Sequence, residues 1–165
     1  IDFSRGHAEV INSLAGVAEK LGFGRKQGRK AAILGLKAQQ QFDIDRVALG
    51  RRLLRQLRES GRLGVVLLAR SYMAQDAGAN LGIAEKLAQL DVVPVPLDLL
   101  PLDSVDPKQY SDRPYWMYES KFIAGTAIAA ADESLYGLAL TNFGCGPKYY
   151  ITPTACKYLT PWVYT

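Results

Sequence analysis

One cysteine stands out as a residue that could do chemistry: Cys145, within the segment 141–147 (TNFGCGP). The apolar run 135–140 before it predicts a buried strand, so the cysteine falls in the loop that follows. Its glycine neighbours carry no side chains to cover the sulfur, and they permit positive φ, so a ligand or cofactor can come close to the backbone. An equally weighted interpretation is a small hydrophobic residue in a tight turn.

Residue types and spacing do not form a complete metal or catalytic site. The other cysteine is Cys156, and the single histidine, His7, lies early in the chain. A structural zinc site needs four ligands, so the Cys and His residues together fall one short. A Ser-His-Asp or Cys-His arrangement would require His7 to reach a distant loop, and we assign it a surface or capping role. The sequence therefore assigns no catalytic residue.

The formal net charge of +4 is unevenly distributed along the chain. Residues 1–62 hold 13 Lys or Arg and 6 Asp or Glu, a net charge of +7, and the remainder is mildly acidic. Clusters such as 25–30 (RKQGRK) could neutralise nucleic-acid phosphates, but no aromatic residues lie among them as base-stacking platforms would. A solvated helix face or a contact surface for another domain is therefore favoured over nucleic acid.

The overall composition is typical of a globular protein, with 48% of the 165 residues hydrophobic and 22% charged. No apolar run is long enough to cross a bilayer, and residues 1–5 (IDFSR) lack the pattern of a signal peptide. We expect a cytoplasmic protein with no membrane partner. The start without an initiator Met leads us to expect one compact domain cut from a larger polypeptide.

Residues 1–62 are predicted to form an N-terminal helical segment. Ser4 is suited to be an N-cap, apolar residues then recur at helical spacing, and Gly22 suits the position after the helix end. Residues 25–60 contain no proline and are rich in Ala, Leu, Gln and Arg, which predicts one long helix. Gly50 is a candidate break in this helix, and Gly61 is expected to end it.

Residues 63–147 are predicted to form a Rossmann-like core with the element order β-α-β-α-β. Apolar runs at 65–68, 92–97 and 135–140 indicate strands, and the stretches 80–90 and 115–131 indicate helices. Right-handed crossovers would place the strands in the order 2-1-3, in a small doubly wound parallel sheet of the α/β class. The second run contains two prolines, which cannot donate ladder hydrogen bonds, so we expect this strand at an edge of the sheet. Residues 148–165 are treated as a C-terminal tail.

The carboxyl ends of these strands are the expected ligand site. Ligands of doubly wound sheets bind outside that edge, where the strand order reverses. The three strands lead into segments that begin near residues 70, 98 and 141, so these segments should meet there. The predicted cofactor-binding residues are Arg70, Tyr72, Asn80, Asp98, Asn142, Gly144 and Gly146.

Two further segments have both a functional and a structural interpretation. Residues 77–83 form a glycine-containing turn into a helix start, where free backbone N–H groups could hold an anion. A helix entry capped by Asn80 has the greater weight. The aromatic run 115–118 (YWMY) is assigned to packing rather than to recognition. The chain has no G-x-x-x-x-G-K-S/T motif, so no ATP site is predicted.

Four segments in order carry a family resemblance: 66–72 (VLLARSY), 80–83 (NLGI) leading into 86–87 (KL), 98–101 (DLLP) and 140–147 (LTNFGCGP). Together they resemble the activase-related proteins of the 2-hydroxyacyl-CoA dehydratase system, over about half of the chain. Large members of that family join ATPase modules to a region similar to the iron–sulfur subunits of the dehydratase. The resemblance implies that this chain is part of the dehydratase-like region.

The resemblance also implies a cofactor and partners. Cys145 matches the glycine-flanked cysteine of the family, for which ligation of a [4Fe-4S] cluster is implied, since thiolates hold such clusters. The other ligands would come from elsewhere in the full-length parent, so this chain alone is expected without the cluster. The implied partners are neighbouring domains of the parent and an acyl-CoA dehydratase, to which the module would support electron transfer. The sequence after Pro147 departs from the family pattern, so Cys156 inherits no role.

Two alternatives stand beside this interpretation. One is a non-catalytic α/β docking module, in which the basic helices and the aromatic run contact neighbouring domains. The other is a binding domain for an anion of the CoA type, with its pocket at Asn80 and Arg70.

Overall fold

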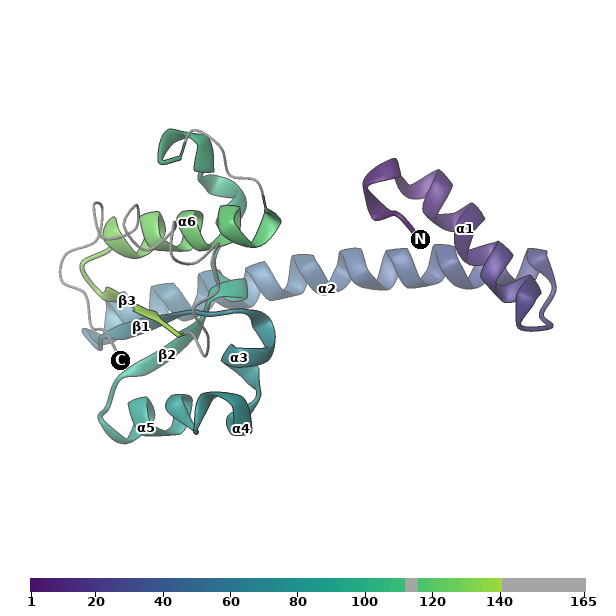
Figure 1. Ribbon diagram of the computed structural model, residues 1–165. Coiled ribbons are helices and arrows are strands. Elements are labelled where there is room, and N and C mark those ends of the chain that lie inside the picture. The colour runs from purple at the N-terminus through teal and green to yellow at the C-terminus, as the bar shows by residue number, and fades with distance from the viewer. Residues whose placement is uncertain (112–115, 141–165) are drawn as a thin grey trace. The chain divides into compact units, whose positions relative to one another are not determined.

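The computed structural model describes residues 1–111 and 116–140 of the 165-residue chain (Figure 1). The chain forms two compact units, Ile1–Asp45 and Arg46–Thr165. The 36-residue helix α2, Arg25–Ser60, contributes its first part to the first unit and its last part to the second.

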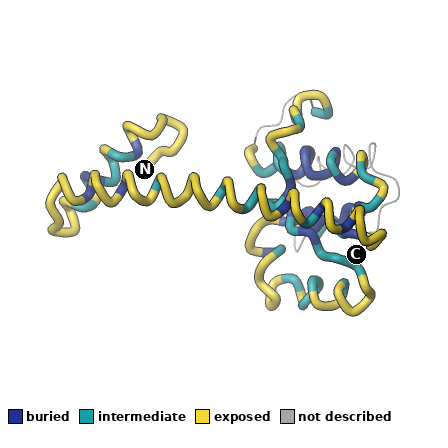
Figure 2. The backbone as a smooth tube through the Cα atoms, turned by 180° about the vertical axis from the view of Figure 1, so that it is seen from behind, coloured by how far each residue is buried: buried dark blue, intermediate teal, exposed yellow. Residues whose placement is uncertain are grey.

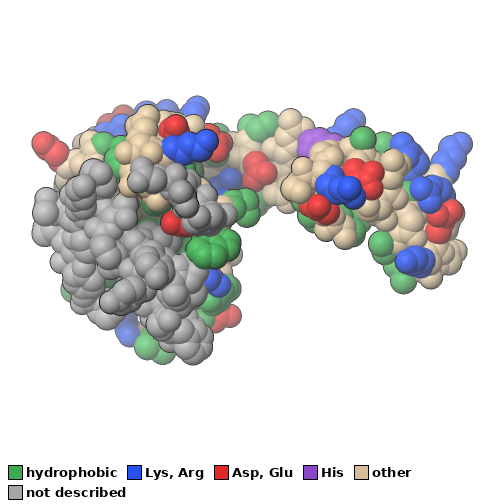
Figure 3. Space-filling view, turned by 45° about the horizontal axis from the view of Figure 1, so that its top comes forward, with side chains coloured by type: hydrophobic (Ala, Val, Ile, Leu, Met, Phe, Trp, Pro, Cys, Tyr) green, Lys and Arg blue, Asp and Glu red, His purple; other side chains and the backbone are tan. Residues whose placement is uncertain are grey.

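The first unit is a helical hairpin. A short 3-10 turn, Phe3–Arg5, leads into α1, His7–Lys20, and the chain then turns back into the start of α2. The two helices are also joined by polar side chains: Arg25 forms an ion pair with Glu19 at 2.6 Å. In the face that Figure 3 shows, Lys and Arg side chains of this unit lie among Asp and Glu side chains, as on a solvated helix surface.

The start of α1 differs from the prediction, whereas its end agrees with it. Ser4 is not the N-cap, because its backbone N–H and its hydroxyl both donate to the carboxylate of Asp2. Gly6, with φ +87°, precedes the helix instead. Gly22 follows the end of α1 with φ +86°, a conformation that glycine adopts without strain.

The close approach of α1 to α2 depends on Gly28, and replacing it with alanine is expected to destabilise the hairpin by about 1 kcal/mol. A Cβ there would lie 2.6 Å from the Cβ of Ala18 and 3.0 Å from the Cα of Ala15. In the alanine variant the two helices must therefore move apart. This loss of packing is expected to outweigh the higher helix propensity of alanine. Gly16→Ala is the matched control, since its Cβ meets no atom within 4 Å, and it should be neutral or stabilising. Thermal unfolding followed by circular dichroism compares the two, and equal stability would contradict this packing.

The second unit contains three parallel strands in the order β2-β1-β3. The strands are β1, Gly64–Leu68; β2, Val93–Pro96; and β3, Leu135–Ala139. This confirms the predicted α/β class and the strand order 2-1-3. The proline-containing strand β2 lies at an edge of the sheet, where missing N–H donors are tolerated.

Helices connect these strands and cover both faces of the sheet. Three short helices follow β1, namely α3, Ser71–Gln75; α4, Ala77–Asn80; and α5, Ile83–Gln89. Between β2 and β3 stand three 3-10 turns, η2 (Leu97–Leu99), η3 (Leu102–Ser104) and η4 (Pro107–Gln109), and the helix α6, Met117–Ala130. Figure 1 shows α6 on one side of the strands and α4 with α5 on the other. The segments 70–79 and 98–111, for which no helix was predicted, thus contain short helical turns.

One hydrophobic core lies between the sheet and the helices α2 and α6. Leu54 and Leu57 of α2, Phe122 of α6 and Val66 of β1 are all buried in it. Figure 2 shows buried residues concentrated in this part of the second unit. Within the described part of the chain, no helix has both the length and the apolar character needed to cross a membrane.

The helix α2 is continuous, so Gly50 is not a break in it. A Cβ at this position would lie 1.6 Å from the carbonyl oxygen of Leu99, in the turn after β2. The glycine therefore permits close packing of α2 on that turn. Gly61 has φ +67° and follows the end of the helix, as predicted.

Candidate functional site

Three elements meet at Asp98, just beyond the end of β2. The hydroxyl of Ser71, after β1, donates to Oδ2 of Asp98 at 3.0 Å. The ammonium of Lys121, in the second turn of α6, donates to Oδ1 at 3.1 Å and forms an ion pair with it. At the carboxyl edge of the sheet, the carboxylate of Asp98 thus links the segment after β1 to α6 through one side-chain donor from each.

These contacts keep Asp98 ionised. Burial raises the pKa of Asp98. The hydrogen bond and charge of Lys121, the hydrogen bond of Ser71 and the charge of Arg46 together lower the pKa by more than burial raises it. The resulting pKa lies below the ordinary value of 3.8. The carboxylate is therefore negative at neutral pH and holds Ser71 and Lys121 in place.

Next to this carboxylate, Arg70 lies against an aromatic ring. Its guanidinium carbon is 5.5 Å from the ring centroid of Tyr118, which is a cation–π arrangement. Burial raises the pKa of the Tyr118 phenol well above its usual value; the charge of Arg70 opposes this shift, and Tyr72 and Asp98 add to it. Tyr118 is therefore a neutral phenol that can donate a hydrogen bond, and it is not suited to act as a base.

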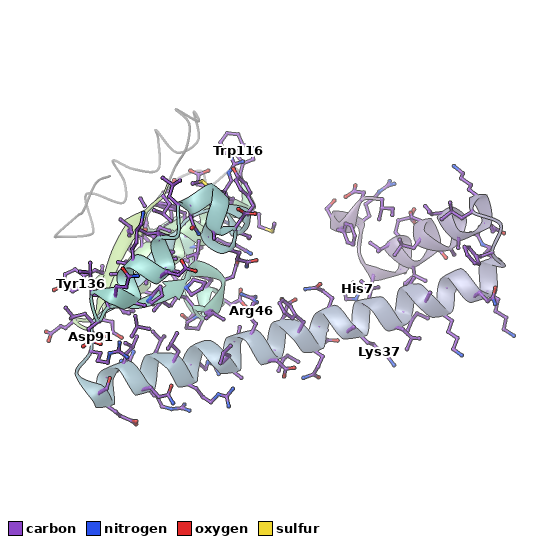
Figure 4. All side chains as sticks on the ribbon, turned by 90° about the horizontal axis from the view of Figure 1, so that it is seen from below. His7, Lys37, Arg46, Asp91, Trp116 and Tyr136 are labelled. Carbon is purple, nitrogen blue, oxygen red and sulfur yellow. The ribbon has the colours of Figure 1, made fainter. Side chains whose placement is uncertain are left out.

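An open pocket of about 500 Å³ lies at this edge, which is within the usual range for small-molecule sites. One wall is the segment 70–72 after β1, and the other is the segment 116–119 at the start of α6. Among the described residues that line it, Arg70 is the one cation and Glu119, a buried residue, is the one carboxylate. Figure 4 shows Trp116 on a different side of the second unit from Tyr136 and Asp91.

The structure brings together some of the residues predicted from the sequence. Arg70 and Tyr72 line the pocket, and Asp98 lies beside them, bound to Ser71. Asn80 has a different position: its side-chain oxygen accepts from the backbone N–H groups of Gly82 and Ile83, and its amide donates to the carbonyl of Ala74. These bonds shape the turn between α4 and α5. Asn142, Gly144, Cys145 and Gly146 lie outside the described residues.

Several residues at this edge were not predicted as part of the site, among them Lys121, Trp116, Tyr118 and Glu119. Lys121 was not considered, and Trp116 and Tyr118 were assigned to packing. The signal that could have identified them is topological: α6 connects β2 to β3, so its N-terminal turns must lie at the carboxyl edge of the sheet. Tyr118 does pack, against Phe122 with 6.4 Å between ring centroids, but it also lines the pocket.

The described residues do not supply a metal or cluster site. No group of three or more His, Cys, Asp or Glu residues within 1–111 and 116–140 is arranged to hold a metal ion. Both cysteines of the chain, Cys145 and Cys156, fall outside these ranges. The chemistry that the described pocket supports is binding, by stacking on aromatic rings and by hydrogen bonds to Arg70 and its neighbours.

Fold and pocket together define a small doubly wound α/β domain with an open pocket at the carboxyl edge of its sheet. Residues 1–100 match the protein family described as CoA enzyme activase uncharacterised domain. The match covers more than half of the chain, which therefore belongs to this family. This confirms the resemblance to CoA-substrate-specific enzyme activases, and it supports a general role in activating a CoA enzyme. No curated protein and no solved structure matches the chain.

Proposed function

We propose that this chain is the dehydratase-like module of a cytoplasmic activator of a 2-hydroxyacyl-CoA dehydratase. In this role it supports single-electron transfer to the acyl-CoA dehydratase, and Cys145 supplies one thiolate ligand to a [4Fe-4S] cluster. The remaining ligands come from outside the described residues. The family membership of residues 1–100 supports the activator role.

The observation that carries the proposal is the parallel pairing of β1 and β3. Leu68 pairs with Ala139, and the backbone N–H of Leu140 donates to the carbonyl of Leu68 at 3.2 Å. The chain therefore leaves β3 at the same edge at which it leaves β1 towards Arg70. Residues 141–147, which contain Cys145, follow directly from that edge. Doubly wound α/β proteins bind their ligands at this edge of the sheet, which supports a cluster ligand in the segment that follows β3 in the sequence.

The test is anaerobic reconstitution of the full-length protein with iron and sulfide. Cys145→Ser is expected to lose most of the bound iron and the visible cluster absorbance, because a serine hydroxyl replaces a thiolate ligand. Cys156→Ser is the matched control and should retain both. Equal cluster content in the two variants would overturn the assignment of Cys145.

A second candidate function, docking of neighbouring domains, is favoured by the surface of the first unit. Large apolar side chains in this unit are exposed: Ile1, Phe3, Val17, Leu21, Phe23, Ile33, Leu34, Phe42 and Ile44. Exposed apolar side chains that form a patch often mark a surface that another protein or domain covers. Cluster content that is unchanged in Cys145→Ser would leave docking as the better-supported role.

A further inference from the structure

We propose that the first unit pairs with the first unit of a second copy of this chain, through the uncharged face of α2 and in antiparallel orientation. The uncharged face consists of Ala31, Leu34, Ala38 and Phe42. The inference goes beyond the proposed cluster function and does not depend on it. It assigns one part of the exposed apolar surface of the first unit to a specific occupant.

The uncharged face is open to solvent along its whole length. All four residues are exposed, and its two large side chains, Leu34 and Phe42, are 57% and 59% exposed. Their spacing of three or four residues places the four side chains on one side of the helix. The helix α1 packs on a neighbouring side of α2, where Gly28 lies against Ala15 and Ala18. The uncharged face is therefore free to receive another helix.

Charged side chains of this part of α2 lie on other sides of the helix. At about 100° per residue, Lys30 and Lys37 fall on the side that also bears Ile44. Figure 4 shows Lys37 on the side of α2 away from α1. Apolar side chains among lysines are suited to a solvated surface, because the long lysine side chains cover them. An uncharged apolar stripe is suited to packing against another helix.

The first unit also buries little apolar surface by itself. Its buried apolar side chains, all within the described range 1–45, are Val10, Ala15 and Ala32. Units of this size commonly gain further stability by oligomerisation. Two helical hairpins that pair through one face form a four-helix bundle, which is a common arrangement. A second copy would thus supply the core that the hairpin lacks.

The uncharged face is complementary in size to its own reverse. In an antiparallel pair with a two-fold axis near residue 36, Leu34 faces Ala38 of the second copy. Ala31 then lies next to Phe42 of the second copy. Each large side chain meets a small one, as close packing requires. A two-fold interface uses the same patch on both partners, so this fit favours a second copy over an unrelated domain.

The charges of α2 select the antiparallel orientation. Residues 25–30 carry four cations and no carboxylate, whereas Asp43 and Asp45 lie at the end of the unit. A parallel pair would place the two basic segments side by side, which is unfavourable. The antiparallel pair places Lys30 near Asp45 of the second copy. Within one chain these two residues are about 22 Å apart along the helix, so they do not pair with each other.

Sedimentation equilibrium of the intact chain in reducing buffer tests the proposal. At about 100 μM the wild type is expected at twice its chain mass of 18.1 kDa. Phe42→Glu should weaken the dimer at least about tenfold, because it buries a carboxylate in the interface. Ile44→Glu is the matched control: Ile44 is 56% exposed but lies on the lysine side, so the dimer should persist. Both residues are exposed, so circular dichroism should show folded protein in each case.

A charge exchange tests the orientation. Asp45→Lys and Lys30→Asp should each weaken the dimer several-fold, because each variant brings like charges together across the interface. The variant with both changes should recover the wild-type association, because the opposite charges then meet again. This recovery requires two chains in antiparallel orientation, since the two positions are too far apart within one helix.

Three results would overturn the proposal. These are a monomeric wild type at this concentration, equal association of Phe42→Glu and Ile44→Glu, and a double charge variant that associates no better than the single ones. A monomer would leave Leu34 and Phe42 to a neighbouring domain. None of these measurements involves the cluster, so failure here is distinct from failure of the Cys145 experiment.

Discussion

Replacing Gly50 with alanine is expected to destabilise the second unit by about 3 kcal/mol, a large part of the stability of a typical domain. In an exposed helix the same change would stabilise, because alanine is the better helix former by up to about 1 kcal/mol. The expected sign is opposite here because the new Cβ would lie 1.6 Å from the carbonyl oxygen and 2.6 Å from the carbonyl carbon of Leu99.

Backbone atoms cannot rotate aside as the end of a side chain can, so α2 and the turn η2 must move apart. Leu54 and Leu57 lie farther along α2 and belong to the core, so this movement would weaken their packing. Asp98 precedes Leu99 in the same turn, and its bonds to Ser71 and Lys121 would be disturbed as well. Gly50 therefore supports both the core and the carboxyl edge of the sheet.

Urea unfolding followed by circular dichroism measures the effect, and Gly35→Ala is the matched control. Gly35 lies in the same helix, but a Cβ there meets no atom within 4 Å. That variant should be as stable as the wild type or more stable. If Gly50→Ala shifts the urea midpoint in the same direction as Gly35→Ala, the tight contact with Leu99 is contradicted.

Gly50 also illustrates what the sequence could and could not predict about the fold. Apolar runs and glycine positions predicted three strands, their order and the end of α2 at Gly61, because these depend on local pattern and on general topology rules. The packing role of Gly50 depends on a residue 49 positions away, and a glycine in a helix looks the same whether it breaks the helix or permits contact. Similarly, Ser4 suits an N-cap by residue type, but in the structure its backbone N–H donates to the carboxylate of Asp2.

The candidate site was likewise predicted in part from topology, and the rest of it depends on packing. Topology predicted that the segments after β1 and β2 share one edge, and Ser71 does contact Asp98 there. The contribution of α6 was not predicted, although a helix was predicted at 115–131 and topology places its N-terminal turns at this edge; which of its side chains, such as Lys121, reach Asp98 depends on how the helix packs. An aromatic run at a helix start is also consistent with simple packing, so only the structure shows that Trp116 and Tyr118 line a pocket.

The second large effect concerns Asp98 and depends on pH. Asp98→Asn is expected to destabilise the protein by about 2 kcal/mol at neutral pH, since it removes the ion pair with Lys121 and weakens the hydrogen bond from Ser71. The Asp98 side chain is 22% exposed and that of Lys121 is 37% exposed, so solvent screening keeps the loss below that of a fully buried pair.

The pH dependence follows from the lowered pKa of Asp98. The folded state binds this proton less tightly than the unfolded state does, so the ionised carboxylate stabilises the fold. That stabilisation is fully present above the ordinary value of 3.8 and is lost as the pH falls through the lower folded pKa. The stability gap between wild type and Asp98→Asn should therefore be constant near neutral pH and shrink towards zero in acid.

Urea unfolding of both proteins across this acidic range measures the gap directly. Asp103→Asn is the matched control, because Asp103 is exposed in the neighbouring turn η3 and does not take part in the contacts of Asp98 with Ser71 and Lys121. The stability of this variant should lie close to that of the wild type at neutral pH. A gap for Asp98→Asn that stays constant into acid would mean that the ionised carboxylate does not stabilise this edge. In that case Ser71 and Lys121 would be held in place by the surrounding packing, and the edge of the sheet would keep its geometry without the charge of Asp98.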